Sequence, residues 1–348
     1  MPAGRVAWID HAKGIGIILV VLMFSALGYD SGAGNWMQGF AHWARPMTVP
    51  VFFLISGLFL HRAIFGSAAA YCDRKILHLA YFFAIWLAID IAFFHASDLV
   101  RKPISFIGLY LAGWVSPEGP IWFLQALGIF FVVTRLLRRV PANRVFAGAA
   151  LLQVLHAAGL AHTGWPVIDH FAEYYVYFFF GYAAVPTVFQ FAHGVTERRQ
   201  DAARAFLVWL AVHTAFVALG IAGLPLVSLI LGFAGSFAII AMAATLAQLP
   251  AAQLIGKTGR NSLAIFLGFS IPMSVAQALL SAGNLIPDAG AASLAVAAAA
   301  FASALVFYRL SMDTPLRVLY VRPQMLHLKA ARSAQRGSLL PSSPVTET

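Results

Sequence analysis

Residues 8–25 read WIDHAKGIGIILVVLMFS and contain an acid, Asp10, and a base, Lys13, at the foot of a long apolar run. In a helix, side chains three positions apart lie on the same face. A membrane-spanning helix needs about 20 mostly apolar residues. We interpret residues 14–29 as the first span, not as a cleaved signal peptide, because further apolar runs follow along the whole chain.

The composition of the chain is that of a membrane protein. Of its 348 residues, 61% are hydrophobic and only 10% are charged, against about 45–50% and about 25% in ordinary globular domains. A soluble protein this apolar would have no surface to present to water. So little charge also argues against nucleic-acid binding, although the net charge is +10. The single cysteine, Cys72, excludes an intrachain disulfide and a cysteine-based metal cluster.

Apolar stretches long enough, or nearly long enough, to cross a membrane recur along the chain. They are 14–29, 46–65, 77–97, 121–138, 145–163, 171–192, 205–223, 225–248, 262–283 and 291–310. The sequence therefore predicts an all-α polytopic membrane protein with about ten transmembrane helices.

The distribution of Lys and Arg predicts the orientation of these spans. With the N-terminus in the cytoplasm, 20 of the 23 basic residues fall on the cytoplasmic side, as the positive-inside rule requires. Both termini are then cytoplasmic. Residues 103–117, PISFIGLYLAGWVSP, are apolar but short. If they were a span, the basic residues that follow would be assigned to the outer side of the membrane, against the positive-inside rule. We interpret them as a re-entrant or surface-lying segment on the outer face.

Several runs of the sequence resemble the acyltransferase-3 family of integral membrane enzymes, which move acyl groups onto hydroxyls of sugars and glycolipids. The first is the opening Asp–Lys segment. The others are VPVFFLISGLFL (49–60), GPIWFLQALGIFF (119–131), YVYFFFGY (175–182), IGKTGRNSLAIFLGFSIP (255–272) and RVLYVRP (317–323). Together they extend the resemblance from about residue 5 to residue 323.

The resemblance implies catalytic roles for the first span. In the family an Asp and a basic residue open this span and a His follows near its far end. Asp10 and Lys13 match, but Phe24 stands where the His belongs, and a phenyl ring cannot accept a proton. Three explanations remain open. Another group acts as the base, with His42 as the first candidate and Asp30 and Asp90 as the others. Alternatively, the protein has lost catalysis, or Phe24 is a change introduced into a normal enzyme.

The resemblance also implies a donor site and an acceptor site. Arg62, Arg74 and Lys75 would meet an acyl coenzyme A, whose phosphates suit basic side chains. Without the resemblance, the positive-inside rule alone explains these basic residues, because they orient the neighbouring spans in the membrane. The acceptor would be a glycan or a lipid-linked sugar at the outer side. No bound cofactor is expected, since acyl coenzyme A is a co-substrate.

Other residues of these motifs have an ordinary structural reading beside the functional one. Ser56 and Gly57 lie within the second motif and suit close helix packing. Trp122 is typical of a membrane-interface anchor, and Glu118 is either an acceptor-orienting group or a solvated loop acid.

Ionisable residues inside spans are costly and indicate function by default. Asp90 is the clearest, and His95, His156, Glu173 and His213 are the others. No pair of histidines has metal-ligand spacing such as His-x-x-x-His, so the sequence predicts no metal site.

The resemblance favours one transmembrane domain, 1–323, followed by a basic, Ser/Pro-rich cytoplasmic tail, 324–348, predicted to be disordered and to lie on anionic lipid. It implies a bacterial inner (cytoplasmic) membrane location. Two alternatives remain open. A transporter or flippase would show paired broken helices in two related halves. A catalytically silent scaffold of polysaccharide assembly would keep the fold without turnover.

Overall fold

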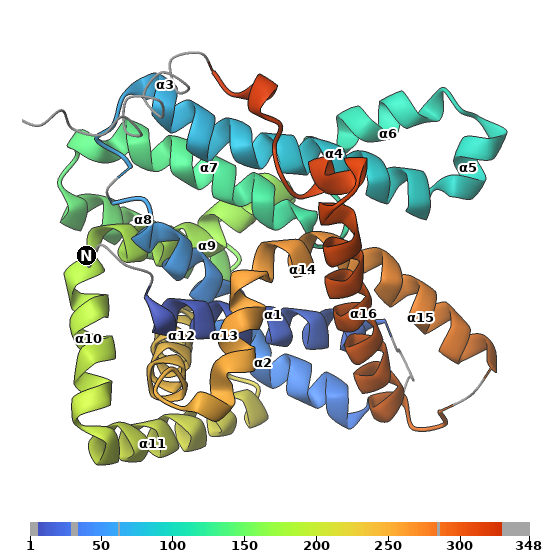
Figure 1. Cartoon of the computed structure of the whole chain (residues 1–348). Coiled ribbons are helices and arrows are strands. Elements are labelled where there is room, and N and C mark those ends of the chain that lie inside the picture. Colours follow the sequence, from blue (N-terminus) through green and yellow to red (C-terminus); the bar gives the residue numbers. More distant parts are fainter. Residues whose placement is uncertain (1–5, 29–33, 62, 284–285, 329–348) are drawn as a thin grey trace, which may run out of the picture.

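The computed structural model describes residues 6–28, 34–61, 63–283 and 286–328, and Figure 1 shows their arrangement. Within these ranges the chain forms helices and contains no strand. The first half consists of α1 (Ala7–Leu27), α2 (Trp36–Leu58), α3 (Ala68–Tyr71), the π-helix η1 (Cys72–Leu77), α4 (His78–Phe94), α5 (Ala96–Arg101), α6 (Ser105–Gly113), η2 (Gly119–Ile121), α7 (Trp122–Leu136), η3 (Leu137–Arg139) and α8 (Ala142–Ala157).

The second half is also helical. It consists of α9 (Pro166–Ala183), α10 (Val185–Glu197), α11 (Arg199–Ala218), α12 (Pro225–Leu246), η4 (Pro250–Ala252), α13 (Gln253–Arg260), α14 (Ser262–Gly268), α15 (Ser270–Gly283), α16 (Ala289–Met312), η5 (Pro315–Leu319) and η6 (Gln324–Leu326).

The structure confirms an all-helical protein with membrane-spanning helices, but it does not confirm ten of them. Among the described residues, six helices are long and apolar enough to span: α1, Ala68–Phe94, Gly119–Arg139, α11, α12 and α16. The number rises to eight if two bent pairs each count as one span. The predicted span at 145–163 shortens to the 16 residues of α8, just below the range of about 17–25 residues that is usual for a transmembrane helix.

Prolines account for the bends in the two broken spans. The axis turns by 80° between α9 and α10, and by 51° between α14 and α15. A proline ring removes an N–H and collides with the carbonyl four residues earlier. Pro272 therefore disturbs the helix at Gly268, the last residue of α14, and Pro186 lies in the first turn of α10.

Helix α1 lies at the centre of the molecule and packs against α2, α12, α13 and α16 (Figure 1). Its crossing with α13 is close. A Cβ atom added to Gly14 would overlap the carbonyl oxygen of Ile255, and one added to Gly259 would overlap that of Asp10. The backbone carrying Asp10 is therefore held directly against α13.

Helices α2 and α9 cross through a second pair of glycines. A Cβ on Gly57 would overlap the carbonyl oxygen of Phe178, and one on Gly181 would overlap that of Leu54. Gly57, the last residue of the Ser-Gly motif, thus fills a packing role. The crossing holds the C-terminal part of α9 against the last turn of α2.

The predicted re-entrant or surface segment at 103–117 contains the nine-residue helix α6. This helix packs on α4, where Gly113 lies against the Leu87 side chain and the Tyr110 hydroxyl donates to the Ala84 carbonyl at 3.3 Å. A helix of this length does not reach across the bilayer.

The C-terminal segment after α16 returns across α4 (Figure 1). The Tyr81 hydroxyl donates to the Val318 carbonyl at 2.8 Å, and the Trp86 indole N–H donates to the Leu319 carbonyl at 3.0 Å. Burial raises the pKa of the Tyr320 phenol. Residues 324–328 of the predicted tail are described, and 329–348 lie outside the described residues.

Candidate functional site

A cavity of about 840 Å³ lies among α1, α2, α7, α9 and α14. Its walls include Lys13, Phe24, His42, Ser56 and Trp122, five of the side chains singled out in the sequence. Lys13 and Phe24 are separated by roughly 16 Å along α1, at about 1.5 Å per residue. The cavity therefore extends along α1, with Lys13 toward one end.

Two lysines converge on Phe59 at this end. The Lys13 ammonium lies 4.4 Å from the centroid of the Phe59 ring, and the Lys75 ammonium lies 3.5 Å from the Phe59 carbonyl oxygen. Lys75 also lies 5.2 Å from the centroid of the Phe131 ring. The two lysines interact electrostatically, and two like charges in a partly buried place favour an anion between them. We call Lys13 and Lys75 the lysine pair.

The other residues predicted near the donor have different surroundings. Arg74 is exposed beside Lys75, and Arg62 lies outside the described residues, as does Asp30. Asp10 is partly buried and does not line the cavity, and its backbone packs on α13.

The opposite end of the cavity gathers polar side chains from α2 and α9. His42 and Arg45, both exposed, come from the first half of α2, and His170 and Glu173 come from α9. Arg45 lies close enough to Glu173 to interact with it electrostatically. The sequence singles out Glu173 as an acid within a predicted span, but it does not indicate that Arg45 and His170 belong to a site. No local pattern links them, because the α2–α9 crossing alone brings them together.

Trp122 stands in an aromatic wall of the cavity. Its ring stacks on His170, with centroids 3.8 Å apart and planes 21° apart, and on Tyr174 at 5.6 Å. Phe53 packs behind it at 6.3 Å. Aromatic faces of this kind suit the apolar faces and C–H groups of sugar rings as well as acyl chains.

Phe24 lines both this cavity and a second one of about 400 Å³. Its ring packs on Phe269, with centroids 5.6 Å apart. Asp90 and Glu118 belong to the second cavity. The Ser270 hydroxyl donates to an Asp90 carboxylate oxygen at 3.3 Å. Two of the predicted site residues, Asp90 and Glu118, therefore line a different cavity from Trp122.

Glu118 has a histidine partner in the second cavity. Its carboxylate lies 3.3 Å from His95 Nε2. The structure thus does not bring Glu118 and Asp90 to the walls of the cavity that contains Lys13 and His42.

A buried acid that sequence reasoning missed holds the segment that carries Arg74 and Lys75. Asp73 is 1% exposed. It accepts from Arg322 at 2.9 Å and from the Leu328 N–H at 2.9 Å, and it lies 2.8 Å from His327 Nδ1. A buried charge needs such partners, so these contacts fix η1 against the C-terminal segment. Nothing in the sequence signals the pairing, because Arg322 reads as one more positive-inside charge.

Comparison with known proteins decides the family. The model of the acyltransferase-3 family, described as an acyltransferase domain, matches residues 6–309. The chain belongs to the acyltransferase-3 family. The match begins before α1 and ends within α16, so it includes every helix that lines the two cavities.

One known protein is also similar to part of the chain. The inner membrane protein YcfT of Escherichia coli (strain K12) is 24% identical over 229 residues, which cover 59% of this chain and 63% of YcfT. The chain thus spans less than two thirds of the length of that relative. No solved structure matches this acyltransferase-3 protein.

Proposed function

We propose that this acyltransferase-3 protein is a membrane O-acyltransferase. It moves an acyl group, an acetyl group in the first instance, from acyl coenzyme A to a hydroxyl of a cell-envelope glycan or lipid-linked sugar. The observation that carries the proposal is one cavity with Lys13 of the lysine pair at one end and His42, Arg45, His170 and Glu173 at the other. Donor and acceptor then enter from opposite ends and meet between them.

The lysine pair has the chemistry to hold the donor. Coenzyme A carries several phosphates, and ammonium groups bind phosphate as point charges. Phe59 and Phe131 lie against these two ammonium groups and keep them in place through cation–π contacts. Arg74, exposed one residue before Lys75, extends the positive surface. The site needs no bound cofactor in this scheme.

The reaction moves one proton in two steps, from the acceptor hydroxyl to a base and from that base to the leaving group. The acceptor oxygen attacks the thioester carbonyl, its proton passes to a base, and the carbon–sulfur bond breaks to release the coenzyme A thiolate, which takes up the proton. A positioned base contributes typically 10²–10⁴-fold. Phe24 cannot be that base. His42 lines the same cavity at the acceptor end and is the base we propose.

We further propose the orientation predicted from charge, with ten spans, cytoplasmic termini and an inner-membrane location. The 20 basic residues on the predicted cytoplasmic side support it, and so does the printed name of the relative YcfT. The lysine pair then faces the cytoplasm, where acyl coenzyme A is made. Membrane lipids surround the spans.

Substitution of His42 by alanine is expected to lower turnover by about 10²–10⁴-fold, because it removes the only histidine on α2 that lines the cavity. The measurement is thiol release from acetyl coenzyme A by the purified protein in detergent, with and without sugar acceptors. His193→Ala is the matched control, since His193 is exposed on α10 and pairs with Glu197.

Two results would count against this scheme. Full turnover in the His42→Ala protein would show that another group is the base. If neither the unmodified protein nor the Phe24→His protein releases thiol or binds the donor, acyl transfer is not the function of this chain.

Transport is the second candidate, and two observations favour it. The helix pairs α9–α10 and α14–α15 are broken by 80° and 51°, as in transporters whose discontinuous helices form the binding site. Helices α9 and α14 both line the large cavity. Exchange of a labelled lipid-linked sugar across vesicles by a chain that does not bind acetyl coenzyme A would favour transport. A silent scaffold would show neither activity.

A further inference from the structure

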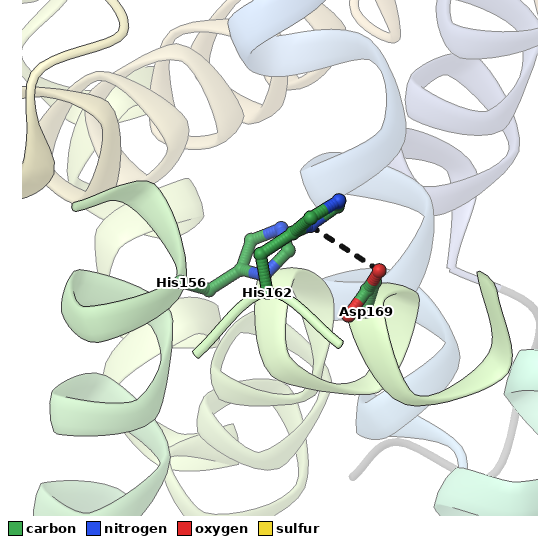
Figure 2. A group of neighbouring side chains, drawn as sticks. All are labelled: His156, His162 and Asp169. Atoms are coloured by element: carbon green, nitrogen blue, oxygen red, sulfur yellow. Dashed lines mark ion pairs between the residues drawn. The ribbon is translucent and has the colours of Figure 1, made fainter. Parts of the chain in front are cut away.

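Three side chains of types that commonly bind metals meet where α8 passes into α9. His156 lies in the last turn of α8, His162 in the connecting loop, and Asp169 in the first turn of α9. Their ligand atoms all lie within 4.8 Å of one another, and Figure 2 shows them converging from the three segments. We propose that His156, His162 and Asp169 form a binding site for Zn²⁺.

The loop between the helices brings the three ligands together. Gly159 and Gly164 have φ values of +76° and +74°, a left-handed conformation that glycine adopts without steric cost. The chain therefore turns sharply after α8 and again before α9. His162 lies between the two turns. The sequence predicts no metal site because its histidines lack the regular spacing of ligands on one helix. Here the two turns bring together ligands that are irregularly spaced along the chain.

Asp169 is held in an orientation suited to a metal ligand. The Thr163 N–H and hydroxyl both donate to Oδ1 at 2.8 Å. Oδ2 accepts from the Gly164 N–H at 3.1 Å and lies 3.2 Å from His162 Nδ1. Outer hydrogen bonds of this kind fix the orientation of metal-binding carboxylates. The carboxylate thus presents Oδ2 toward the histidines.

His156 supplies a second, independent observation. Its Nδ1 atom is buried and has no hydrogen-bond partner within the described ranges. A buried polar atom left without a partner costs about 1–3 kcal/mol. The ring lies 5.5 Å from that of His162, centroid to centroid. A cation between the two rings would give the buried nitrogen a partner.

The donor set selects the metal. Two imidazoles and a carboxylate suit Zn²⁺, with a water in the fourth position, whereas Mg²⁺ and Ca²⁺ prefer oxygen ligands alone. Tetrahedral Zn²⁺ with bonds of about 2.0–2.1 Å places its ligand atoms roughly 3.4 Å apart. The side chain of His162 is 62% exposed and has room to turn by the distance that this requires.

The site adjoins the acceptor end of the large cavity. Asp169 directly precedes His170, which stacks on Trp122, and Glu173 follows one turn later. His156 interacts electrostatically with both His170 and Glu173. A bound divalent cation would therefore join α8 to α9 and add positive charge beside that end of the cavity. Binding itself does not depend on acyl transfer.

The test is Zn²⁺ titration of the whole protein, purified with an affinity tag that contains no histidine and stripped with a chelator. We expect one Zn²⁺ per chain by calorimetry and by elemental analysis after desalting. We expect Co²⁺ to give the visible absorption bands of a tetrahedral complex. His156→Ala and His162→Ala should each weaken binding by at least tenfold.

Control variants separate a metal site from a hydrogen-bonded loop. His193→Ala removes an exposed histidine that pairs with a carboxylate on α10 and should leave the titration unchanged. Thr163→Val removes a hydroxyl that orients Asp169 but no ligand, and should weaken binding by less than the histidine variants do. Because His162 is exposed, its variant is informative even if His156→Ala fails to fold. Binding that is absent, or equal in wild type and His162→Ala, overturns the proposal.

Discussion

In a protein that lacks the proposed base through His42→Ala, replacement of Phe24 by histidine is expected to raise thiol release from acetyl coenzyme A by about 10²–10⁴-fold, the usual contribution of a positioned base. Phe24 lines the cavity beyond Lys13 on the same helix, at the position where the family motif predicts a histidine. An imidazole is smaller than a phenyl ring, so it enters the site without overpacking. The measurement is initial rate against acetyl coenzyme A with a panel of sugar acceptors.

Phe24→Leu is the matched control for this substitution. It removes the ring that packs on Phe269 and separates the two cavities, but it supplies no base. If the leucine and histidine proteins show the same increase in the rate of thiol release, the increase comes from the larger cavity and not from a base. A folded histidine protein that is no faster than the leucine protein would show that a base at position 24 does not reach the acceptor hydroxyl.

Substitution of Gly259 by alanine is expected to cause the largest loss of stability of any single methyl group added to the described part of the chain. The added Cβ would overlap the carbonyl oxygen of Asp10, so α1 and α13 must separate. Overpacking typically costs 1–3 kcal/mol, and contact with backbone leaves less room for relaxation than contact with a side chain does. Thermal unfolding in detergent, followed by size exclusion, measures the effect.

The control for Gly259 is Gly128→Ala in the middle of α7, where nothing lies within 4 Å of the added Cβ. There, alanine should leave the melting temperature unchanged or raise it, since glycine is about 0.8–1.0 kcal/mol poorer than alanine within a helix. Equal melting temperatures for the two variants would show that the α1–α13 crossing is looser than described.

Hydropathy predicted most of the helices and the family motifs predicted the family. Every predicted span contains a helix, because about 20 apolar residues leave the backbone few other ways to satisfy its hydrogen bonds in lipid. The count of ten remained unconfirmed for local reasons. Pro186 and Pro272 each break an apolar run that hydropathy treats as continuous. The run at 145–163 ends early at the turn beginning with Gly159, and the run at 46–65 extends beyond Leu58, the last residue of α2.

The placement of the predicted residues in one cavity follows from the sequence only where a motif lies on one helix. Lys13 and Phe24 are on α1, so their common cavity follows from the sequence of that helix. Glu118 and Asp90 were grouped with Trp122, but the packing around Phe24 places them in the second cavity. The pairing of Asp73 with Arg322 spans 249 residues. Contacts of this kind depend on how the C-terminal segment returns across α4, which no local pattern encodes.

The binding of acetyl coenzyme A to oriented membranes tests the central claim most directly. Acetyl coenzyme A does not cross a bilayer, so labelled donor should bind inside-out vesicles that contain the unmodified chain and not right-side-out vesicles. Lys13→Met should reduce this binding at least tenfold, whereas Lys257→Met, a basic residue of α13 that does not line the cavity, should not. Binding from the opposite face, or binding that is unaffected by Lys13→Met, would contradict a donor site at the lysine pair.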